Sequence, residues 1–186
     1  MSVKYLSRKS YSERAVEIGK GHWKNAHRRW VYHGAAVAFA QIVAPSSAAS
    51  VLEMGTMGIS CIEGSHTIDY LDSWDFQGKA PTYAHDARKT PWPVETDTYK
   101  LLIALRVYHH LAPVQREAFN EARRVARNLI ICSPESYDKV KGSRGIPLES
   151  YIEWNDGREP TAIMEIDEEF GNLYFWNEKA LRGRVT

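Results

Sequence analysis

The sequence predicts an α/β fold with a doubly wound, mostly parallel sheet of seven strands that ends in an antiparallel hairpin. Three observations carry this prediction. A long helical segment opens the chain, short apolar runs alternate with helical segments after residue 50, and two strand-like runs lie near the end. Alternating strands and helices favour a parallel sheet covered on both faces, because each crossover returns the chain to the same edge.

The opening segment reads as helical up to Ala44. From Trp23 onward, apolar residues recur three and four positions apart, which is the period of one helix face. Pro45 and the two serines after it end the pattern. We expect residues 1–45 to form a helical lid or cap, and residues 46–186 to form the core domain.

Five short apolar runs then predict buried strands, at residues 51–54, 67–71, 82–84, 101–105 and 129–132. A helix is expected over 113–127, because Pro113 suits a first turn and small apolar residues repeat after it at helical spacing. The runs 162–166 and 173–176 are separated by a short polar segment, which predicts the closing hairpin.

Length and composition limit the class of protein. A chain of 186 residues suits one domain, and its longest apolar stretch, residues 34–44, is shorter than the roughly 18–20 residues of a membrane span. No signal-like segment opens the chain, and the two cysteines lack metal-site spacing. We therefore expect a cytoplasmic protein with no membrane segment and no metal.

Charge is unevenly distributed. Residues 1–33 hold eight Lys or Arg against two Glu, although the net charge of the whole chain is only +1. Such a segment could attract phosphate, carboxylate or nucleic acid, or it could be a solvated helix face. By itself it does not predict a nucleic-acid-binding protein.

The first apolar run ends in the loop Glu53-Met54-Gly55-Thr56-Met57-Gly58. Ligands of open α/β sheets bind beyond the carboxyl ends of the strands, where the strand order reverses. Glycines there allow a sharp turn and a close approach of a ligand. Both the dinucleotide fingerprint and a P-loop lysine are absent. The loop is also compatible with a simple tight turn.

Acids near the ends of three successive runs make a nucleotide-like ligand a better explanation than a simple turn. Asp72 comes 19 residues after Glu53, and a carboxylate there can accept hydrogen bonds from both hydroxyls of a ribose. Asp69, within the second run, is the alternative. Asp86 follows the third run, where it could accept from an adenine amino group, and Trp74 could pack on the adenine or in the core.

Four pieces of the chain resemble the class I S-adenosylmethionine-dependent methyltransferases, and the last of them resembles the small-molecule members. They are residues 51–58, Asp72-Ser73, residues 85–87 with Pro91-Trp92-Pro93, and residues 101–111 leading to 124–127. The resemblance implies a Rossmann-like fold whose hairpin supplies the sixth and seventh strands. It also implies S-adenosyl-L-methionine as the cofactor.

The resemblance further implies roles for the matching residues. Glu53 and Gly55, with Thr56, Met57 and Gly58 of the same loop, would lie near the methionine part of the cofactor. Asp72 would hold the ribose, Asp86 and Ala87 would bracket the adenine, and Arg106 would border the methyl donor.

Methyl transfer from a sulfonium needs alignment above all, and a base only for a hydroxyl or a protonated amine. His109 and His110 follow the fourth run and titrate near neutral pH, so they are the candidate bases, although either could instead pack the loop. The candidate lid or substrate residues are Tyr11, His22, Trp23 and Arg28. Arginine suits an anionic acceptor, whereas Trp23 equally fits a core.

The predicted function is methyl transfer to a small acceptor, such as a sugar or natural-product hydroxyl or amine. The chain lacks an Asn/Asp-Pro-Pro-aromatic motif, which weighs against methylation of nucleic-acid bases. Met57 and Ile59 stand where the family has its second and third glycines. The alternative is therefore an inactive relative that binds a nucleotide-like ligand or a protein partner. A second subunit could cover the acceptor, so a homodimer is one expectation.

Overall fold

The computed structural model describes residues 3–19, 21–71, 79–136 and 145–183, without the side chains of residues 21 and 22. Asp72 and Trp74, and the side chain of His22, therefore lie outside the described part of the chain. The helices are α1 (Arg8–Ile18), α2 (Ala26–Val43), α3 (Gln115–Val125), α4 (Leu148–Trp154) and α5 (Glu178–Arg182). Short 3₁₀ turns span Gly21–Asn25, Ala48–Ser50 and Tyr108–His110.

One seven-stranded sheet runs through the molecule in the order β3-β2-β1-β4-β5-β7-β6. The strands are β1 (Val51–Met54), β2 (His66–Asp69), β3 (Tyr83–Ala84), β4 (Leu101–Leu105), β5 (Leu129–Ser133), β6 (Ala162–Asp167) and β7 (Gly171–Trp176). The first five are parallel, and β7 is antiparallel to both β5 and β6. The predicted fold class is confirmed, including the closing hairpin.

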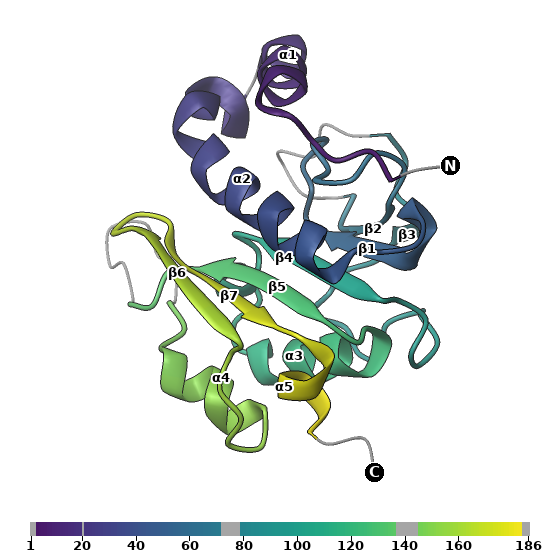
Figure 1. Cartoon of the computed structure of the whole chain (residues 1–186), viewed down its shortest axis with the longest axis vertical. Helices are drawn as coiled ribbons and strands as arrows, with labels where there is room; N and C mark the ends of the chain where they lie inside the picture. The colour runs from purple at the N-terminus through teal and green to yellow at the C-terminus, as the bar shows by residue number, and fades with distance from the viewer. Residues whose placement is uncertain (1–2, 20, 72–78, 137–144, 184–186) are drawn as a thin grey trace.

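Helices cover both faces of the sheet (Figure 1). The apolar side of α2 packs on one face, in a buried cluster that contains Ala36, Ile103 and Phe175. On the other face α3, α4 and α5 pack around Trp176 and Phe119. The first cluster includes residues on both sides of position 45, so α2 contributes to the same hydrophobic core as the strands.

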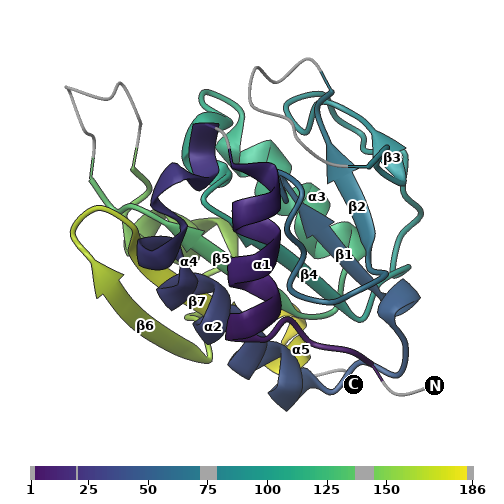
Figure 2. The same cartoon turned by 90° about the horizontal axis from the view of Figure 1, so that it is seen from above.

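The crossover from β1 to β2 contains no helix. Residues 55–65 form turns, and the N-terminal segment pairs with them: the Leu6 amide donates to the Cys61 carbonyl (2.8 Å) and the Glu63 amide donates to the Lys4 carbonyl (2.9 Å). Helix α1 follows that segment and lies alongside α2 (Figure 2). Its buried residues Tyr11 and Ala15 pack with Ile59 of the crossover. The N-terminus thus supplies the cover that a crossover helix would provide.

Candidate functional site

The candidate site lies at the carboxyl ends of β1, β2 and β4. Strand β1 has β2 on one side and β4 on the other, so the strand order reverses beside it, where ligands of such sheets bind. The loop after β1 is tightly turned, with positive φ at Gly55 (68°), Met57 (52°) and Gly58 (93°).

Gly55 is required by its close approach to the segment that follows β4. A Cβ built at Gly55 would lie 2.3 Å from Cγ2 of Val107, two residues past the end of β4. The missing side chain therefore lets the two strand ends pack together. That role explains the glycine without any ligand.

Glu53 holds the crossover in place. Its buried carboxylate accepts hydrogen bonds from the amides of Cys61 (2.7 Å) and Ile62 (2.9 Å) and from the Ser65 hydroxyl (2.8 Å). Burial raises the pKa of Glu53 to about 7 against the opposing effect of these donors. These three bonds connect the end of β1 to the turns that replace a helix.

Asp69 is the acid at the end of β2, and its carboxylate faces the glycine loop. One oxygen accepts from the Thr56 amide (3.0 Å) and the other from the Thr56 hydroxyl (3.3 Å). Burial raises the pKa of Asp69 to about 7. Of the two acids considered for the ribose, Asp69 is the one whose contact with the loop the structure describes.

A cavity of about 20 Å³ borders the loop, which is room for roughly one water molecule. It is lined by Trp23, Tyr32, His33, Glu53, Met54, Gly55, Thr56, Met57, Ile59, Ile103 and Leu105. The indole N–H of Trp23 donates to the Met57 carbonyl at 2.8 Å, and Trp23 is only 4% exposed. Tyr11, equally buried, packs edge-on against Trp23 and donates to the Ala26 carbonyl. Both candidate lid aromatics therefore fill the space over the loop.

Arg28 points elsewhere, to the turn between β6 and β7. It forms an ion pair with Glu169 (2.9 Å), and its guanidinium lies 5.8 Å from the ring centre of Phe170. Arg106, directly after β4, reaches the same turn and donates to the Phe170 carbonyl at 3.2 Å. Two residues expected at different parts of the site thus meet at the β6–β7 turn.

The third acid, Asp86, is paired within its own loop. Its carboxylate accepts from the backbone and the guanidinium of Arg88 at 2.9–3.1 Å. These hydrogen bonds to Arg88 lower the pKa of Asp86. The carbonyl of Ala87 accepts from the Trp92 indole (3.0 Å).

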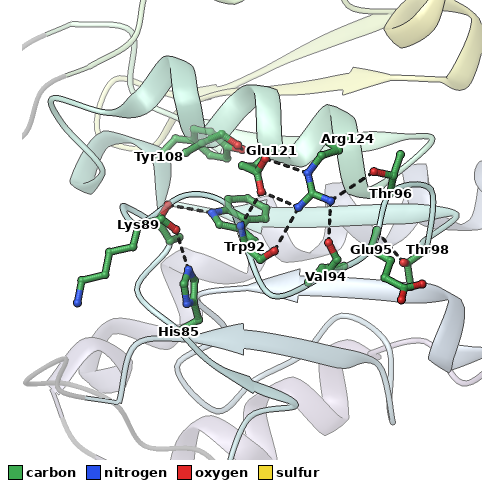
Figure 3. Close-up of polar contacts among 12 residues, drawn as sticks. His85, Lys89, Trp92, Val94, Glu95, Thr96, Thr98, Tyr108, Glu121 and Arg124 are labelled. Carbon is green, nitrogen blue, oxygen red and sulfur yellow. Dashed lines mark hydrogen bonds and ion pairs between the residues drawn. The ribbon is translucent and has the colours of Figure 1, made fainter.

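Beyond Asp86, a polar network fastens the loop to α3 (Figure 3). The Glu121 carboxylate accepts from the Trp92 amide (2.6 Å) and from Arg124 (2.7 Å). Arg124 in turn donates to the carbonyls of Val94 (2.7 Å) and Trp92 (3.2 Å). Residues 92–94 of the loop that would border an adenine are therefore bound to α3.

The two histidines differ in access. His109 is 4% exposed, whereas His110 is exposed and its ring centre lies 3.9 Å from that of His109. Although His110 is exposed as a residue, its ring is partly desolvated by its surroundings, and this effect, followed by the charge of Arg106, lowers the pKa of His110. His110 is thus neutral at pH 7, the form that can accept a proton.

The described residues contain neither a membrane-spanning helix nor a metal-binding cluster. No helix there is long and apolar enough to cross a membrane. No group of three or more His, Cys, Asp or Glu side chains there is arranged to hold a metal ion.

Comparison with solved structures identifies the fold. Magnesium protoporphyrin IX methyltransferase from Synechocystis PCC 6803, solved with bound SAH, aligns with a TM-score of 0.57 at 14% identity over 88% of this chain and 91% of its own. This chain has a methyltransferase fold. A chain in the complex between the Haloferax volcanii Trm112 methyltransferase activator and a methyltransferase aligns with a TM-score of 0.54 at 11% identity, over 88% of this chain and 96% of its own. No family model and no curated protein sequence matches this chain.

Two local features of the site were not predicted from the sequence. They are the close packing of Val107 against Gly55 and the cluster of arginines around Phe170. One signal could have suggested the second: the N-terminal segment is basic, while residues 167–169 just before Phe170 are all acidic.

Proposed function

We propose that this chain is an S-adenosylmethionine-dependent methyltransferase that acts on a small acceptor. One observation carries the proposal. At the switch point of a methyltransferase-type sheet, the tight loop after β1 meets the carboxylate of Asp69 at the end of β2. A turn and an acid at these two places suit the binding of a nucleoside.

Asp69 is the residue we propose for the ribose. Its two oxygens provide about four acceptor positions, and Thr56 uses two of them. The remaining positions suit the two ribose hydroxyls. The backbone of residues 55–58 would face the methionine part, and Ala87 with the loop held by Glu121 would border the adenine. When bound, the cofactor supplies a methyl group activated on a sulfonium.

We propose that the N-terminal segment moves when the cofactor binds, since the cavity that borders the loop has room for about one water molecule. The indole of Trp23 is held there by a hydrogen bond to the Met57 carbonyl. We therefore propose that residues 1–25 act as the lid, with Trp23 leaving the loop when the cofactor enters. Of the two candidate histidines, His110 is the proposed base for the acceptor, since it is exposed and neutral at pH 7.

The test is calorimetric titration with S-adenosylmethionine and S-adenosylhomocysteine. We expect both to bind, and Asp69→Asn to weaken binding about ten- to a hundredfold, because one charge-assisted hydrogen bond contributes about 1.5–3 kcal/mol. Asp72→Asn tests the other candidate acid, and the exposed Glu159→Gln controls for loss of a charge. A larger loss with Asp72→Asn than with Asp69→Asn would reassign the ribose. Equal losses for all three variants would contradict a role for either acid.

A second candidate function is a non-catalytic domain that binds a protein partner or another nucleotide-like ligand. The packing of Trp23 and Tyr11 over the loop favours it, because these side chains fill the expected cofactor space. Trp23→Ala separates the two candidates. Binding of S-adenosylhomocysteine to Trp23→Ala but not to the wild type would show a closed lid over an intact site. Binding to neither protein would favour the second candidate.

A further inference from the structure

Three arginines gather around one aromatic ring at the carboxyl edge of the sheet. The guanidinium carbons of Arg28, Arg29 and Arg106 lie 5.8, 5.7 and 5.6 Å from the ring centre of Phe170. Arg28 has a carboxylate partner in Glu169. Among the described residues, no carboxylate forms an ion pair with Arg29 or Arg106, although the charge of Glu169 acts on Arg106 from a distance. Apart from one hydrogen bond each, to the Tyr32 hydroxyl and to the Phe170 carbonyl, these two neighbouring cations share the ring of Phe170.

The position of Arg29 in α2 makes this arrangement costly. Arg28 and Arg29 are the third and fourth residues of α2, and the first turn of this helix contains no acid. The amino end of a helix carries a partial positive charge, so cations there are unfavourable and anions favourable. In addition, the buried Nε of Arg29 has no hydrogen-bond partner, while its Nη1 donates to the Tyr32 hydroxyl (3.3 Å).

Arg106 carries a second, independent sign of a functional position. Its φ is +63°, a conformation that is uncommon for a residue with a side chain and is often found at binding sites. The backbone is kept there by the bond from its amide to the Cys132 carbonyl (2.8 Å). This conformation directs the residue that follows β4 toward the β6–β7 turn, where its side chain donates to the Phe170 carbonyl.

The arginines are adjacent to the candidate site. Tyr32 lines the cavity beside Gly55, and its ring packs edge-on against Phe170 at 5.0 Å. One aromatic side chain therefore separates the cavity from the cationic cluster. His110, the proposed base, is also close enough for the charge of Arg106 to lower its pKa.

We propose that Arg29 and Arg106 bind an oxyanion, the carboxylate or phosphate group of the small acceptor. Glu169 is the described carboxylate whose charge acts on this cationic cluster, so an oxyanion would add countercharge. It would also complement the amino end of α2 and accept from the guanidinium forks, which suit bidentate contacts. That the anion belongs to a methyl acceptor rests on the proposed function. The anion site itself does not, because it can be occupied without the cofactor.

The experiment titrates the cofactor-free protein with inorganic phosphate and with acetate, against chloride at equal ionic strength. The melting temperature and the heat of binding are measured for the wild type, Arg29→Gln and Arg106→Gln. The matched control is Arg116→Gln, an exposed arginine of α3 paired with Glu153. We expect phosphate, acetate or both to bind, and each cluster variant to weaken that binding about tenfold or more, with no change in the control.

Binding of one anion only would assign the acceptor to that chemical class. If Arg106→Gln fails to fold because its bond to Phe170 is lost, Arg29→Gln and Arg29→Lys carry the test, with Lys expected to bind with intermediate affinity. No difference between the two oxyanions and chloride, or an equal loss in the control, would overturn the proposal. Titration of the same proteins with S-adenosylhomocysteine distinguishes failure of this proposal from failure of the proposed function. Anion binding without cofactor binding would support the anion site and contradict methyl transfer.

Discussion

Substitution of Gly55 by alanine should destabilise the fold through two separable effects. A side chain at a φ of +68° costs about 1–2 kcal/mol. The new Cβ would also lie 2.3 Å from Cγ2 of Val107, and overpacking of this kind costs about 1–3 kcal/mol. The free energy of unfolding should therefore fall by about 2–5 kcal/mol, a large share of the roughly 5–15 kcal/mol typical of a domain.

A double-mutant cycle separates the two effects. Val107→Ala alone should cost about 1 kcal/mol, because this half-buried side chain loses two methyl groups. In Gly55→Ala/Val107→Ala the new Cβ meets no Cγ atom, so adding Gly55→Ala to Val107→Ala should cost only the backbone strain. The coupling energy between the two substitutions should be about 1–3 kcal/mol and favourable. Gly157→Ala is the matched control, since Gly157 has a φ of +78° and a Cβ there would meet nothing within 4 Å.

The assay is urea denaturation of the four proteins of the cycle and of the control, followed by circular dichroism. The expected order of unfolding free energies places Gly157→Ala about 1–2 kcal/mol below the wild type and Gly55→Ala lowest among the single variants. Additive effects within about 0.5 kcal/mol would refute the steric role of Val107. Equal costs for Gly55→Ala and Gly157→Ala would refute it as well.

Two further stability predictions concern the buried carboxylate of Glu53 and the half-buried carboxylate of Glu121. Burial raises the pKa of Glu53 from 4.5 to about 7, so the folded state binds more protons, and stability present below pH 4.5 should be lost as pH rises toward 7. The loss from this group should be about 3 kcal/mol. The free energy of unfolding, measured by urea denaturation at several pH values in this range, should depend less on pH in Glu53→Gln than in the wild type. The pH dependence that remains should come from Asp69, and an unchanged pH dependence would contradict the assignment. At the loop on α3, Glu121→Gln should cost about 1–3 kcal/mol, because the Trp92 amide and Arg124 lose a charged acceptor. The exposed Glu95→Gln of the same loop should stay within about 0.5 kcal/mol of the wild type in the same assay, and equal costs would count against the network.

Local patterns were sufficient for the strands and for most of the helices. The observed bounds of β1 and β4 are those expected, β5 and β6 extend one residue beyond prediction, and β7 begins two residues earlier. The second strand ends at Asp69 instead of residue 71, which places that acid at the strand end. These elements were predictable because apolar periodicity and turn residues act over a few positions.

The site depended on contacts between residues far apart in the chain. The cover of the β1–β2 crossover comes from residues 3–18, and no pattern within residues 55–65 indicates it. In the same way, the spacing of residues in the sequence could not show whether Asp86 pairs with Arg88 or remains open to a ligand.

By itself, the sequence determined the α/β class, the parallel order with its closing hairpin, and a tight loop after the first strand. Only the tertiary structure decided which side chains meet at that loop. Arg29, Arg106 and Phe170 come from three separate elements, and Trp23 reaches Met57 from the N-terminal segment. The physical reason is that hydrophobic periodicity specifies which face of each element is buried, whereas charge pairing and hydrogen bonding depend on distances that exist only after the elements have packed.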